Sequence, residues 1–490
     1  MKTTRYGGVS AYVATATATA IILTTVVIVL IISFSAVFSC FLSSTDSKPE
    51  FVIPIVQLQS QINLTHQHSD EYKFRAVISP DHYRSSTSFP LILNRNRTFI
   101  ARRRRRRPEI ELARARAAIR RAASVHNLSQ VLRSGDVLSS DIYHNPSAFY
   151  QSYMEMEKRF KVYVYEEGEL PMVHDGPCKN IYTTEGRFIM EMEHGGHNFR
   201  TKHAHQAHVY FMPFSVTWMV KYLYKPDTYD MTPLRHFVSD YVRLISTKHP
   251  FWNTTHAADH FMLSCHDWGP HASKAHPNLY TNSIRVLCNA NSSEGFDPQK
   301  DVSLPEINLH SGNIPSKLVS PPPPTTSRSH LAFFAGGVHG PIRPILLHHW
   351  MGRDPDLQIF EYLPKHLDYY SLMLASKYCL CPSGYEVASP RIVESIYSEC
   401  VPVIISENYV LPFSDVLKWE AFSVNVKVSD VSRLKEILMG VREDEYLRLK
   451  ENLRQVRRHF VLNQPSQRFD VFHMILHSVW LRRLNLKLEE

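Results

Sequence analysis

The chain has 490 residues, of which 44% are apolar, and it carries a formal net charge of +9. This length and apolar content suit roughly two or three folded domains and exclude a wholly disordered protein. Residues 102–107 are all arginine, so much of the excess charge is local, and the rest of the chain gives no reason to expect a nucleic-acid partner.

The longest apolar stretch lies near the N-terminus. Residues 6–45 contain no charged side chain, and residues 20–42 are long enough to span a bilayer as a helix. Lys2 and Arg5 precede this stretch. The positive-inside rule therefore predicts a cytosolic tail at residues 1–19, a transmembrane signal anchor at residues 20–42, and a lumenal or extracellular position for the rest of the chain.

Residues 43–145 have the composition of a stem. They are rich in Ser, His, Asn and Arg and show little periodicity, which is typical of a flexible tether. One helix is expected near residues 108–123, because Pro108 suits a first turn and Glu109 complements the positive end of the helix dipole. The arginine run ahead of it is expected to meet acidic polysaccharide, lipid headgroups or a processing protease.

Two further signals agree with an exit from the cytosol. Five Asn-x-Ser/Thr sequons follow the apolar stretch and are predicted glycosylation sites, namely Asn63, Asn96, Asn127, Asn253 and Asn291. Six of the seven cysteines also follow it, and an even number fits an oxidising compartment. The sequence does not determine how these cysteines pair.

Short apolar runs alternate with helical segments in the rest of the chain and predict two α/β lobes. In the N-terminal lobe, residues 146–310, the expected strands are 161–165, 208–213, 260–265 and 285–288, and the longest helical segments are 186–193 and 234–247. In the C-terminal lobe, residues 331–460, the expected strands are 331–334, 357–362, 378–381 and 401–405, with helices at 344–350, 367–376, 431–440 and 443–459.

A proline-rich linker, residues 311–330, separates these lobes, and a last helix within residues 461–490 is free to return to the first lobe. The predicted fold class is therefore α/β, with two facing Rossmann-like lobes and a cleft between them. Parallel sheets bind ligands at the carboxyl ends of their strands, so the cleft is the expected site.

The stretch 378–406 has the pattern strand, polar loop, helix, strand. Ser389 is expected to cap the helix, and Arg391 and Glu394 share one face of it. We expect the amides of Ser383 and Gly384, the helix terminus and Arg391 to hold a diphosphate, with Glu394 accepting ribose hydroxyls. The alternative is that Arg391 and Glu394 form a surface ion pair.

Five blocks carry a resemblance to a known family: FKVYVYEEGELP, AHVYFMPFSV, ADHFMLSCHDWGP, FFAGGVHGPIRPILL and CPSGYEVASPRIVESIYSECVPVIISENYVLPFSDVL. Together they resemble the plant-type exostosin-like family of inverting glycosyltransferases over about residues 160–484. The resemblance implies a GT-B fold, a single-pass type II protein of the Golgi membrane, and sugar transfer from a nucleotide sugar to a cell-wall or matrix polysaccharide.

On the donor side, this resemblance adds the glycine-rich turn 336–343 to the loop around Arg391. Gly336 and Gly337 allow a close approach of backbone to phosphate, and Arg343 begins the next helix, so Arg343 and Arg391 are expected to flank the diphosphate. A tight turn without ligand is the alternative for the two glycines.

No obligatory metal or other cofactor is expected. Asp354 and Asp356 imitate the Asp-x-Asp metal motif of the other main glycosyltransferase fold, but they are placed in a loop beyond a helix. A zinc site on His203, His205 and His208 is the disfavoured alternative to a strand entrance.

For the catalytic base we favour Asp267, with His266 as the alternative, because both follow a predicted strand of the first lobe. Asp259 precedes the same strand and is expected to face away. The rival to an enzyme is a non-catalytic lumenal scaffold subunit that serves a partner glycosyltransferase in a homo- or hetero-oligomer.

Overall fold

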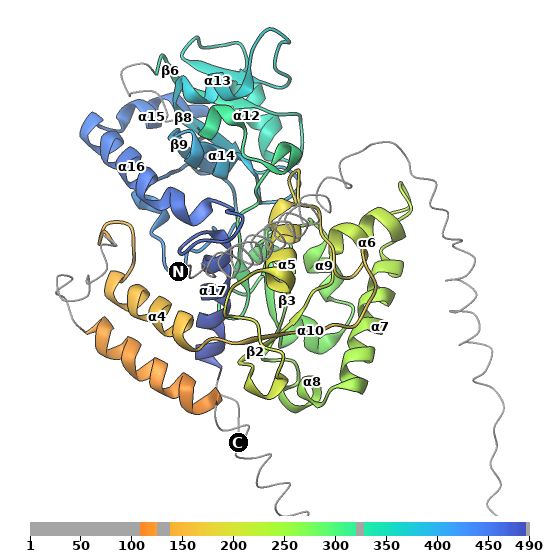
Figure 1. Cartoon of the computed structure of the whole chain (residues 1–490). Helices are drawn as coiled ribbons and strands as arrows, with labels where there is room; N and C mark the ends of the chain where they lie inside the picture. Colours follow the sequence, from red (N-terminus) through yellow and green to blue (C-terminus); the bar gives the residue numbers. More distant parts are fainter. Residues whose placement is uncertain (1–107, 125–137, 320–327, 487–490) are drawn as a thin grey trace, which may run out of the picture. The chain divides into compact units, whose positions relative to one another are not determined.

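The computed structural model describes residues 108–124, 138–319 and 328–486 (Figure 1). The predicted membrane anchor, the arginine run and the sequons at Asn63, Asn96 and Asn127 lie outside these residues. Within the described ranges, no helix combines the length and the apolar character needed to cross a membrane.

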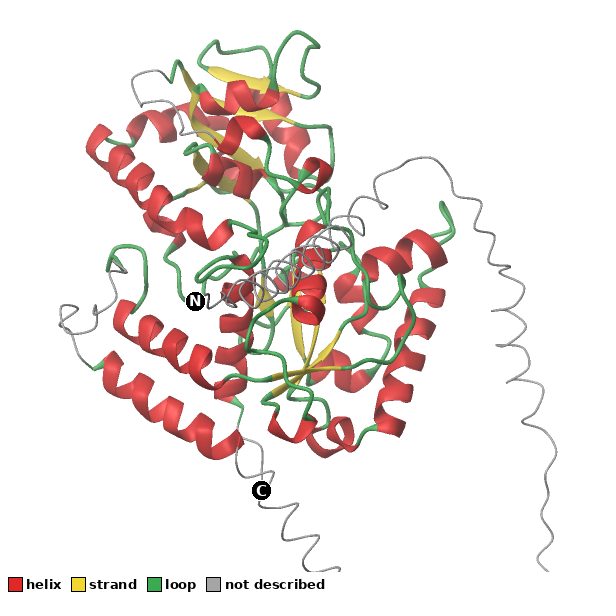
Figure 2. Ribbon diagram, in the orientation of Figure 1, coloured by secondary structure: helices red, strands yellow, loops and turns green. Residues whose placement is uncertain are grey.

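The N-terminal lobe is built on a sheet of five parallel strands in chain order (Figure 2). Its strands are β1 (Val162–Val164), β2 (Val209–Met212), β3 (His260–Ser264), β4 (Ile284–Leu287) and β5 (Val302–Ser303). Alternate residues enter two cores, with Phe261 on one face and Met262 on the other. Buried side chains on both faces explain why these strands appear in the sequence as continuous apolar runs.

Besides the helix at residues 108–123, the described part of the chain contributes eight α-helices to this lobe: α4 (Pro146–Arg159), α5 (Thr183–His194), α6 (Val216–Leu223), α7 (Thr232–Lys248), α8 (Pro250–Thr255), α9 (Gly269–Ser273), α10 (Pro277–Thr281) and α17 (Val471–Asn485). The last of these, α17, comes from the C-terminal end of the chain and packs against α4, β4 and β5 (Figure 1).

The helix at residues 108–123 is part of the folded lobe rather than of a free stem. Leu112 and Ala115 are fully buried in the same core as α17. Arg116 donates from Nε to the carbonyl oxygen of Leu484 over 2.6 Å, and Arg483 forms an ion pair with Glu109. The folded region therefore includes residues ahead of position 146, where the sequence alone places its start.

The C-terminal lobe has a second sheet of five parallel strands, in the order β10-β9-β8-β6-β7. Its strands are β6 (His330–Ala335), β7 (Leu357–Phe360), β8 (Ser376–Pro382), β9 (Val401–Ile405) and β10 (Val424–Asn425). The accompanying helices are α11 (Ser316–Val319), α12 (Ile342–Trp350), α13 (Tyr369–Leu374), α14 (Arg391–Tyr397), α15 (Leu434–Gly440) and α16 (Glu443–Val456). The order of strands reverses at β6, which lies between β7 and β8, and this reversal creates a topological switch point.

Two disulfides join neighbouring strands, one in each lobe. Cys265 pairs with Cys288, just after the ends of β3 and β4, and Cys379 of β8 pairs with Cys400, which precedes β9. The structure thus pairs four of the six cysteines whose pairing the sequence leaves open.

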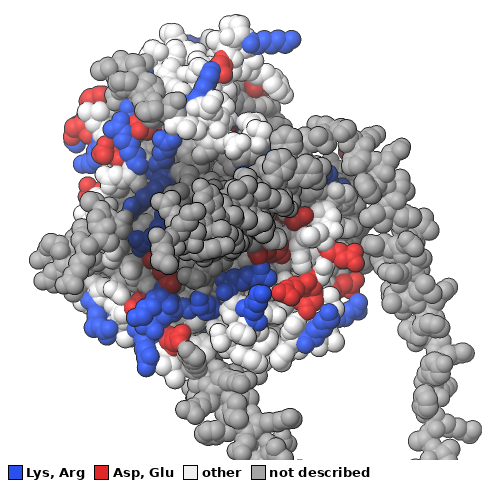
Figure 3. Space-filling model, viewed as in Figure 1, with Lys and Arg blue, Asp and Glu red and all other residues white. Residues whose placement is uncertain are grey.

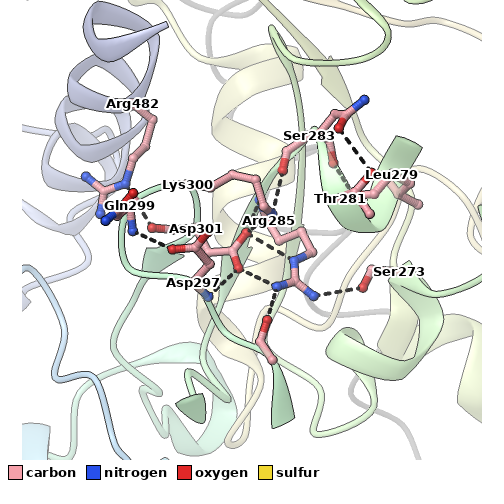
Figure 4. A network of polar contacts seen from close by, with 12 residues as sticks. Ser273, Leu279, Thr281, Ser283, Arg285, Asp297, Gln299, Lys300, Asp301 and Arg482 are labelled. Atoms are coloured by element: carbon pink, nitrogen blue, oxygen red, sulfur yellow. Dashed lines mark hydrogen bonds and ion pairs between the residues drawn. The ribbon is translucent and has the colours of Figure 1, made fainter. Parts of the chain in front are cut away.

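A buried charge network fixes β4 to the loop before β5 (Figure 4). Arg285 is 1% exposed and its Nε donates to Asp301 over 3.0 Å, while its Nη2 contacts the second carboxylate oxygen. Lys300 and the amide of Asp297 also donate to Asp301, and Arg482 of α17 donates to its carbonyl oxygen over 2.9 Å. One carboxylate thus connects the sheet to its neighbouring loop, while the main chain beside it holds the returning helix.

We expect Asp301→Asn to lower the free energy of unfolding by about 3–5 kcal/mol, because the Arg285 guanidinium would remain buried without its counter-charge. Chemical denaturation of the two proteins measures this difference. Asp240→Asn is the matched control, since the Arg243–Asp240 pair is 77% and 64% exposed and contributes less than about 1 kcal/mol. Equal losses in the two variants would contradict the structural role given to Asp301.

Candidate active site

A cavity lies at the switch point of the C-terminal sheet. The loop after β6 carries residues 336–341 and the loop after β8 carries residues 383–390, so both emerge at the carboxyl ends of adjacent strands. The cavity has a volume of about 660 Å³ and is lined by residues of both lobes. This volume suits a ligand of nucleotide-sugar size.

The lining combines two cations, several carboxyl groups and aromatic side chains. From the N-terminal lobe and the segment that follows it come Ile181, Asp267, Glu306, Asn308 and His310. From the C-terminal lobe come His339, Arg343, Tyr369, Tyr370, Gly384, Tyr385, Glu386, Ala388, Ser389, Pro390, Arg391 and Glu394.

Arg391 and Arg343 both line this cavity, as the sequence predicts. Arg391 is 9% exposed; its Nη2 donates to the carbonyl oxygen of Ala335 over 2.8 Å, and its guanidinium lies 4.8 Å from the ring centre of Phe334. Arg343 donates from Nη1 to Gly337 over 3.4 Å. The Nε atom of each guanidinium is buried and has no hydrogen-bond partner among the described residues. A buried and a partly buried cation, each with an unused donor, favour an anionic ligand.

The proximity of the two cations has an electrostatic consequence. Burial, and then the charge of Arg391, lower the pKa of Arg343 to about 10. A diphosphate between them would relieve this repulsion, because it supplies negative charge to both guanidinium groups.

The backbone of the two loops differs from the prediction in three respects. The amides of Ser383 and Gly384 donate to the carbonyl oxygens of Ile405 and Glu386, both over 3.1 Å, so they are not available to a phosphate. Ser383 does not line the cavity, and its hydroxyl donates to Ser406 over 2.6 Å. Ser389 does not cap the helix, since α14 begins at Arg391 and Ser389 instead accepts from that guanidinium over 3.3 Å.

The glycines hold the loops close together rather than forming an open phosphate cradle. The amide of Gly336 donates to Phe360 over 3.1 Å, and a Cβ on this residue would lie 2.9 Å from Nη2 of Arg391. Gly340 has φ +69°, and a Cβ there would overlap the carbonyl oxygen of Gly384. Gly336 thus leaves room for Arg391, and Gly340 allows contact between the loops, whereas a Cβ on Gly337 would lie 3.3 Å from Nε2 of His339.

Glu394 is buried, which rules out the alternative of a surface ion pair with Arg391. It is 6% exposed and accepts hydrogen bonds from the hydroxyls of Tyr369 and Tyr370 over 3.1 and 3.5 Å. Burial raises the pKa of this carboxyl group despite the nearby Arg391.

Sequence reasoning missed two carboxyl groups of the cavity. Glu306 is 6% exposed, and burial together with the charges of Asp267 and Glu394 raises its pKa well above the ordinary value. Burial raises the pKa of Glu386 to about 7, and its carboxylate accepts a hydrogen bond from Asn289 of the N-terminal lobe. Glu306 follows β5, which has only two residues, so no strand pattern marked its position.

Asp267 and His266, the two predicted bases, have different surroundings. Asp267 lines the cavity, and burial raises its pKa to about 6, although a hydrogen bond from Tyr182 opposes this shift. The ring of His266 stacks on Tyr182 at 4.8 Å and is not among the lining residues; burial lowers its pKa to about 4. Asp267 is therefore the better placed of the two.

Side chains of both alternative metal sites make other contacts in the structure. Asp354 and Asp356 both accept from the ammonium of Lys435, over 2.6 and 2.8 Å, and neither lines the cavity. His208 is 2% exposed and its Nδ1 accepts from the amide of Lys161. Across the described ranges, no three side chains of His, Cys, Asp or Glu form a group that could hold a metal ion.

Two predicted glycosylation sites lie in the described residues. Asn253 is exposed, and its amide nitrogen donates to the carbonyl oxygen of Ser246 over 2.9 Å. Asn291 is 9% exposed, and its amide nitrogen donates to Glu294 over 3.0 Å. Both sites stay predictions, and Asn253 is the more accessible of the two.

Comparison with known proteins identifies the family. The model of the exostosin GT47 domain matches residues 156–441, which is more than half of the chain. The chain belongs to the exostosin GT47 family. This match confirms the resemblance seen in the sequence.

Relatives of this exostosin GT47 chain carry glycosyltransferase names. A probable glycosyltransferase of Arabidopsis thaliana is 62% identical over 79% of this chain and 80% of its own length. A probable glucuronosyltransferase of Oryza sativa is 28% identical over 66% of this chain and 77% of its own length, and a probable beta-1,4-xylosyltransferase of Arabidopsis thaliana is 28% identical over 66% and 82%. This member of the family is thus a glycosyltransferase. Its two parallel-sheet lobes are consistent with the GT-B fold.

Proposed function

We propose that this protein is an inverting hexosyl- or pentosyltransferase that moves a sugar from a nucleotide-sugar donor to a cell-wall or matrix polysaccharide. One observation carries the proposal: Arg391, which is buried, and Arg343, which is partly buried, each have an unused Nε donor and line the same cavity as Asp267 of the opposite lobe. The cavity therefore combines a site for a leaving diphosphate with a site for a base.

On the donor side, the two guanidinium groups bind the diphosphate and stabilise the charge that develops on it as the glycosidic bond breaks. Glu394 accepts hydrogen bonds from the ribose hydroxyls, since hydrogen bonds from Tyr369 and Tyr370 hold its carboxylate in the cavity. The arginines supply the positive charge that a metal provides in other transferases, so we expect no obligatory metal.

On the acceptor side, the carboxylate of Asp267 takes the proton of an acceptor hydroxyl. The oxygen attacks the anomeric carbon from the face opposite the diphosphate, the bond from that carbon to the diphosphate oxygen breaks, and the nucleoside diphosphate leaves. One displacement inverts the anomeric configuration, and it requires only one base.

We further propose that the protein lies in the Golgi membrane as a single-pass type II protein with its catalytic domain in the lumen. Residues 20–42 are uncharged and apolar, and Lys2 and Arg5 precede them. The disulfides Cys265–Cys288 and Cys379–Cys400 support a lumenal position, because disulfides persist in the oxidising secretory compartments.

The test is incubation of the full-length, detergent-solubilised protein with a panel of nucleotide sugars, with and without a chelator. We expect binding and slow hydrolysis of at least one donor, unchanged by the chelator. If the folded protein binds none of them and only supports the activity of a co-purified homologue, it is a scaffold subunit and the proposal fails.

A further inference from the structure

An aromatic pair lies on α6 of the N-terminal lobe, outside the cavity. Trp218 and Tyr222 are four residues apart, so they share one face of the helix, and their rings stack at 5.3 Å with an interplanar angle of 11°. Tyr222 is 53% exposed, and neither residue lines the cavity. Trp218 is partly buried, so solvent reaches part of its ring as well as that of Tyr222. Large aromatic side chains at the surface are typical of binding surfaces.

The pair is continuous with the acceptor side of the cavity. α6 begins shortly after the carboxyl end of β2, the strand that neighbours β3. At its other end, Tyr224 packs edge-on against Trp268 at 4.6 Å, and Trp268 directly follows Asp267. The same edge of the sheet therefore presents the base and the aromatic pair (Figure 1 labels α6 and the neighbouring α9).

A buried carboxylate holds this arrangement in place. Glu185 of α5 is fully buried and accepts from the hydroxyl of Ser215, from the amide of Thr217 over 3.2 Å and from the amide of Cys265 over 2.9 Å. Ser215 in turn caps α6 by accepting from the amide of Trp218 over 3.2 Å. Glu185 thus fixes the start of α6 to the end of β3, and the surface is preorganised relative to Asp267.

The surface has the chemistry that binds sugar chains. A pyranose ring has an apolar face of C–H groups that packs against flat aromatic rings, while its hydroxyls need polar partners. The ammonium of Lys221 lies 4.6 Å from the ring centre of Trp218 and 5.6 Å from that of Tyr222. This cation can donate to hydroxyls of a neutral sugar or pair with the carboxylate of a uronic acid.

We propose that Trp218, Tyr222 and Lys221 form a distal subsite that binds a polysaccharide acceptor several sugars away from the hydroxyl that is attacked. The inference rests on the proposed function, because it assigns the acceptor of the same active site. It makes the protein an enzyme that extends or decorates long chains, since only a long acceptor reaches both Asp267 and α6.

The variants that test the subsite are Trp218→Ala and Tyr222→Ala, each in the full-length, detergent-solubilised protein. Binding is measured by retardation in gels that contain xylan, xyloglucan, glucomannan or homogalacturonan. We expect at least one polysaccharide to retard the unaltered protein, and each variant to bind it about tenfold more weakly. Leu447→Ala, which removes a 47% exposed side chain from α16, is the matched control and keeps full retardation.

Lys221→Ala distinguishes an acidic polysaccharide acceptor, which contains uronic acids, from a neutral one. It weakens retardation by homogalacturonan more than retardation by the neutral polysaccharides if the subsite binds uronic acids, and it weakens both kinds equally if the acceptor is neutral. Either result supports the subsite.

A parallel measurement with uridine and guanosine diphosphates distinguishes the subsite from the donor site. Both diphosphate affinities are expected to be unchanged in Tyr222→Ala. Equal retardation of Tyr222→Ala and the unaltered protein would overturn the subsite and leave the proposed function standing, as would absence of all retardation by a protein that binds a diphosphate. Loss of retardation in the variants of a protein that binds no diphosphate would support the subsite and remove the proposed enzyme.

Discussion

Replacing Arg391 with lysine is expected to lower the turnover of sugar transfer by about 10²–10³-fold, because a lysine supplies a point charge but cannot reproduce the planar set of donors. In the folded protein, Nη1 of Arg391 donates to the hydroxyl of Ser389 and Nη2 donates to the carbonyl oxygen of Ala335, and these two hydrogen bonds fix the plane of the guanidinium. The stacking on Phe334 fixes it further. The group is thus held in one orientation before a donor arrives, and catalysis by preorganised charge depends on that orientation.

The measurement is the rate of transfer with a donor that the unaltered protein accepts, corrected for the fraction of folded protein. Arg328→Lys is the matched control, because Arg328 is also buried in the C-terminal lobe but donates to the carbonyl oxygens of Ser376 and Ser398, both over 2.6 Å, away from the cavity. It is expected to lose stability and keep its turnover. If both variants lose turnover equally, Arg391 has a structural role only.

The sequence predicted the position of Arg391 because the helix is short and follows a strong strand signal. It did not predict that Arg391 and Glu394 are both buried, since a polar face at a helix start is ordinarily solvated. Burial there comes from elements remote in sequence, with Phe334 beneath the guanidinium and Tyr369 against the carboxylate. Helical periodicity cannot reveal such neighbours.

The role expected for the amides of Ser383 and Gly384 failed for a related reason. A glycine-containing loop ahead of a helix is a frequent phosphate site, but its amides serve a ligand only if no carbonyl oxygen within the protein accepts them. Here Ile405 of the next strand and Glu386 of the same loop accept them. The sequence showed the loop and not its internal hydrogen bonds.

The base was easier to predict than the rest of the acceptor side. Asp267 follows a strand whose five residues are all buried, so the strand end and the polar residue after it were visible in the sequence. Glu306 has no such marker, and Asn289 contacts Glu386 only because the two lobes meet. Contacts between lobes are set by packing at long range, and a single sequence does not encode them in any local pattern.

Replacing Asp267 with asparagine is expected to lower turnover by about 10²–10⁴-fold while leaving donor binding unchanged, because the amide cannot accept the proton of the acceptor hydroxyl. Asp259→Asn is the matched control. Asp259 is 6% exposed at the opposite end of β3. Its Oδ1 accepts a hydrogen bond from the hydroxyl of Thr255 over 2.5 Å and lies 2.9 Å from Nδ1 of His260. Its replacement is expected to leave turnover per folded molecule intact.

The pH dependence gives a second readout of the same role. Burial raises the pKa of Asp267 from 3.8 to about 6, and only the ionised form acts as a base. Activity in the unaltered protein is therefore expected to rise with pH through about 6 and to level off above it. Besides burial, the pKa of this carboxyl is raised by the negative charge of Glu294 and lowered by the hydrogen bond from Tyr182. The charge of Asp267 in turn raises the pKa values of Glu306 and Glu386.

The residual activity of Asp267→Asn is expected to lose this rise around pH 6. If the variant keeps both the rise and most of its turnover, the proton is taken by another group. Glu386 would then be the next residue to replace, because it lines the same cavity and burial raises its pKa to about 7. The rise of activity would in that case be centred about one pH unit higher than Asp267 requires, so the midpoint of the profile in the unaltered protein decides between the two carboxyl groups.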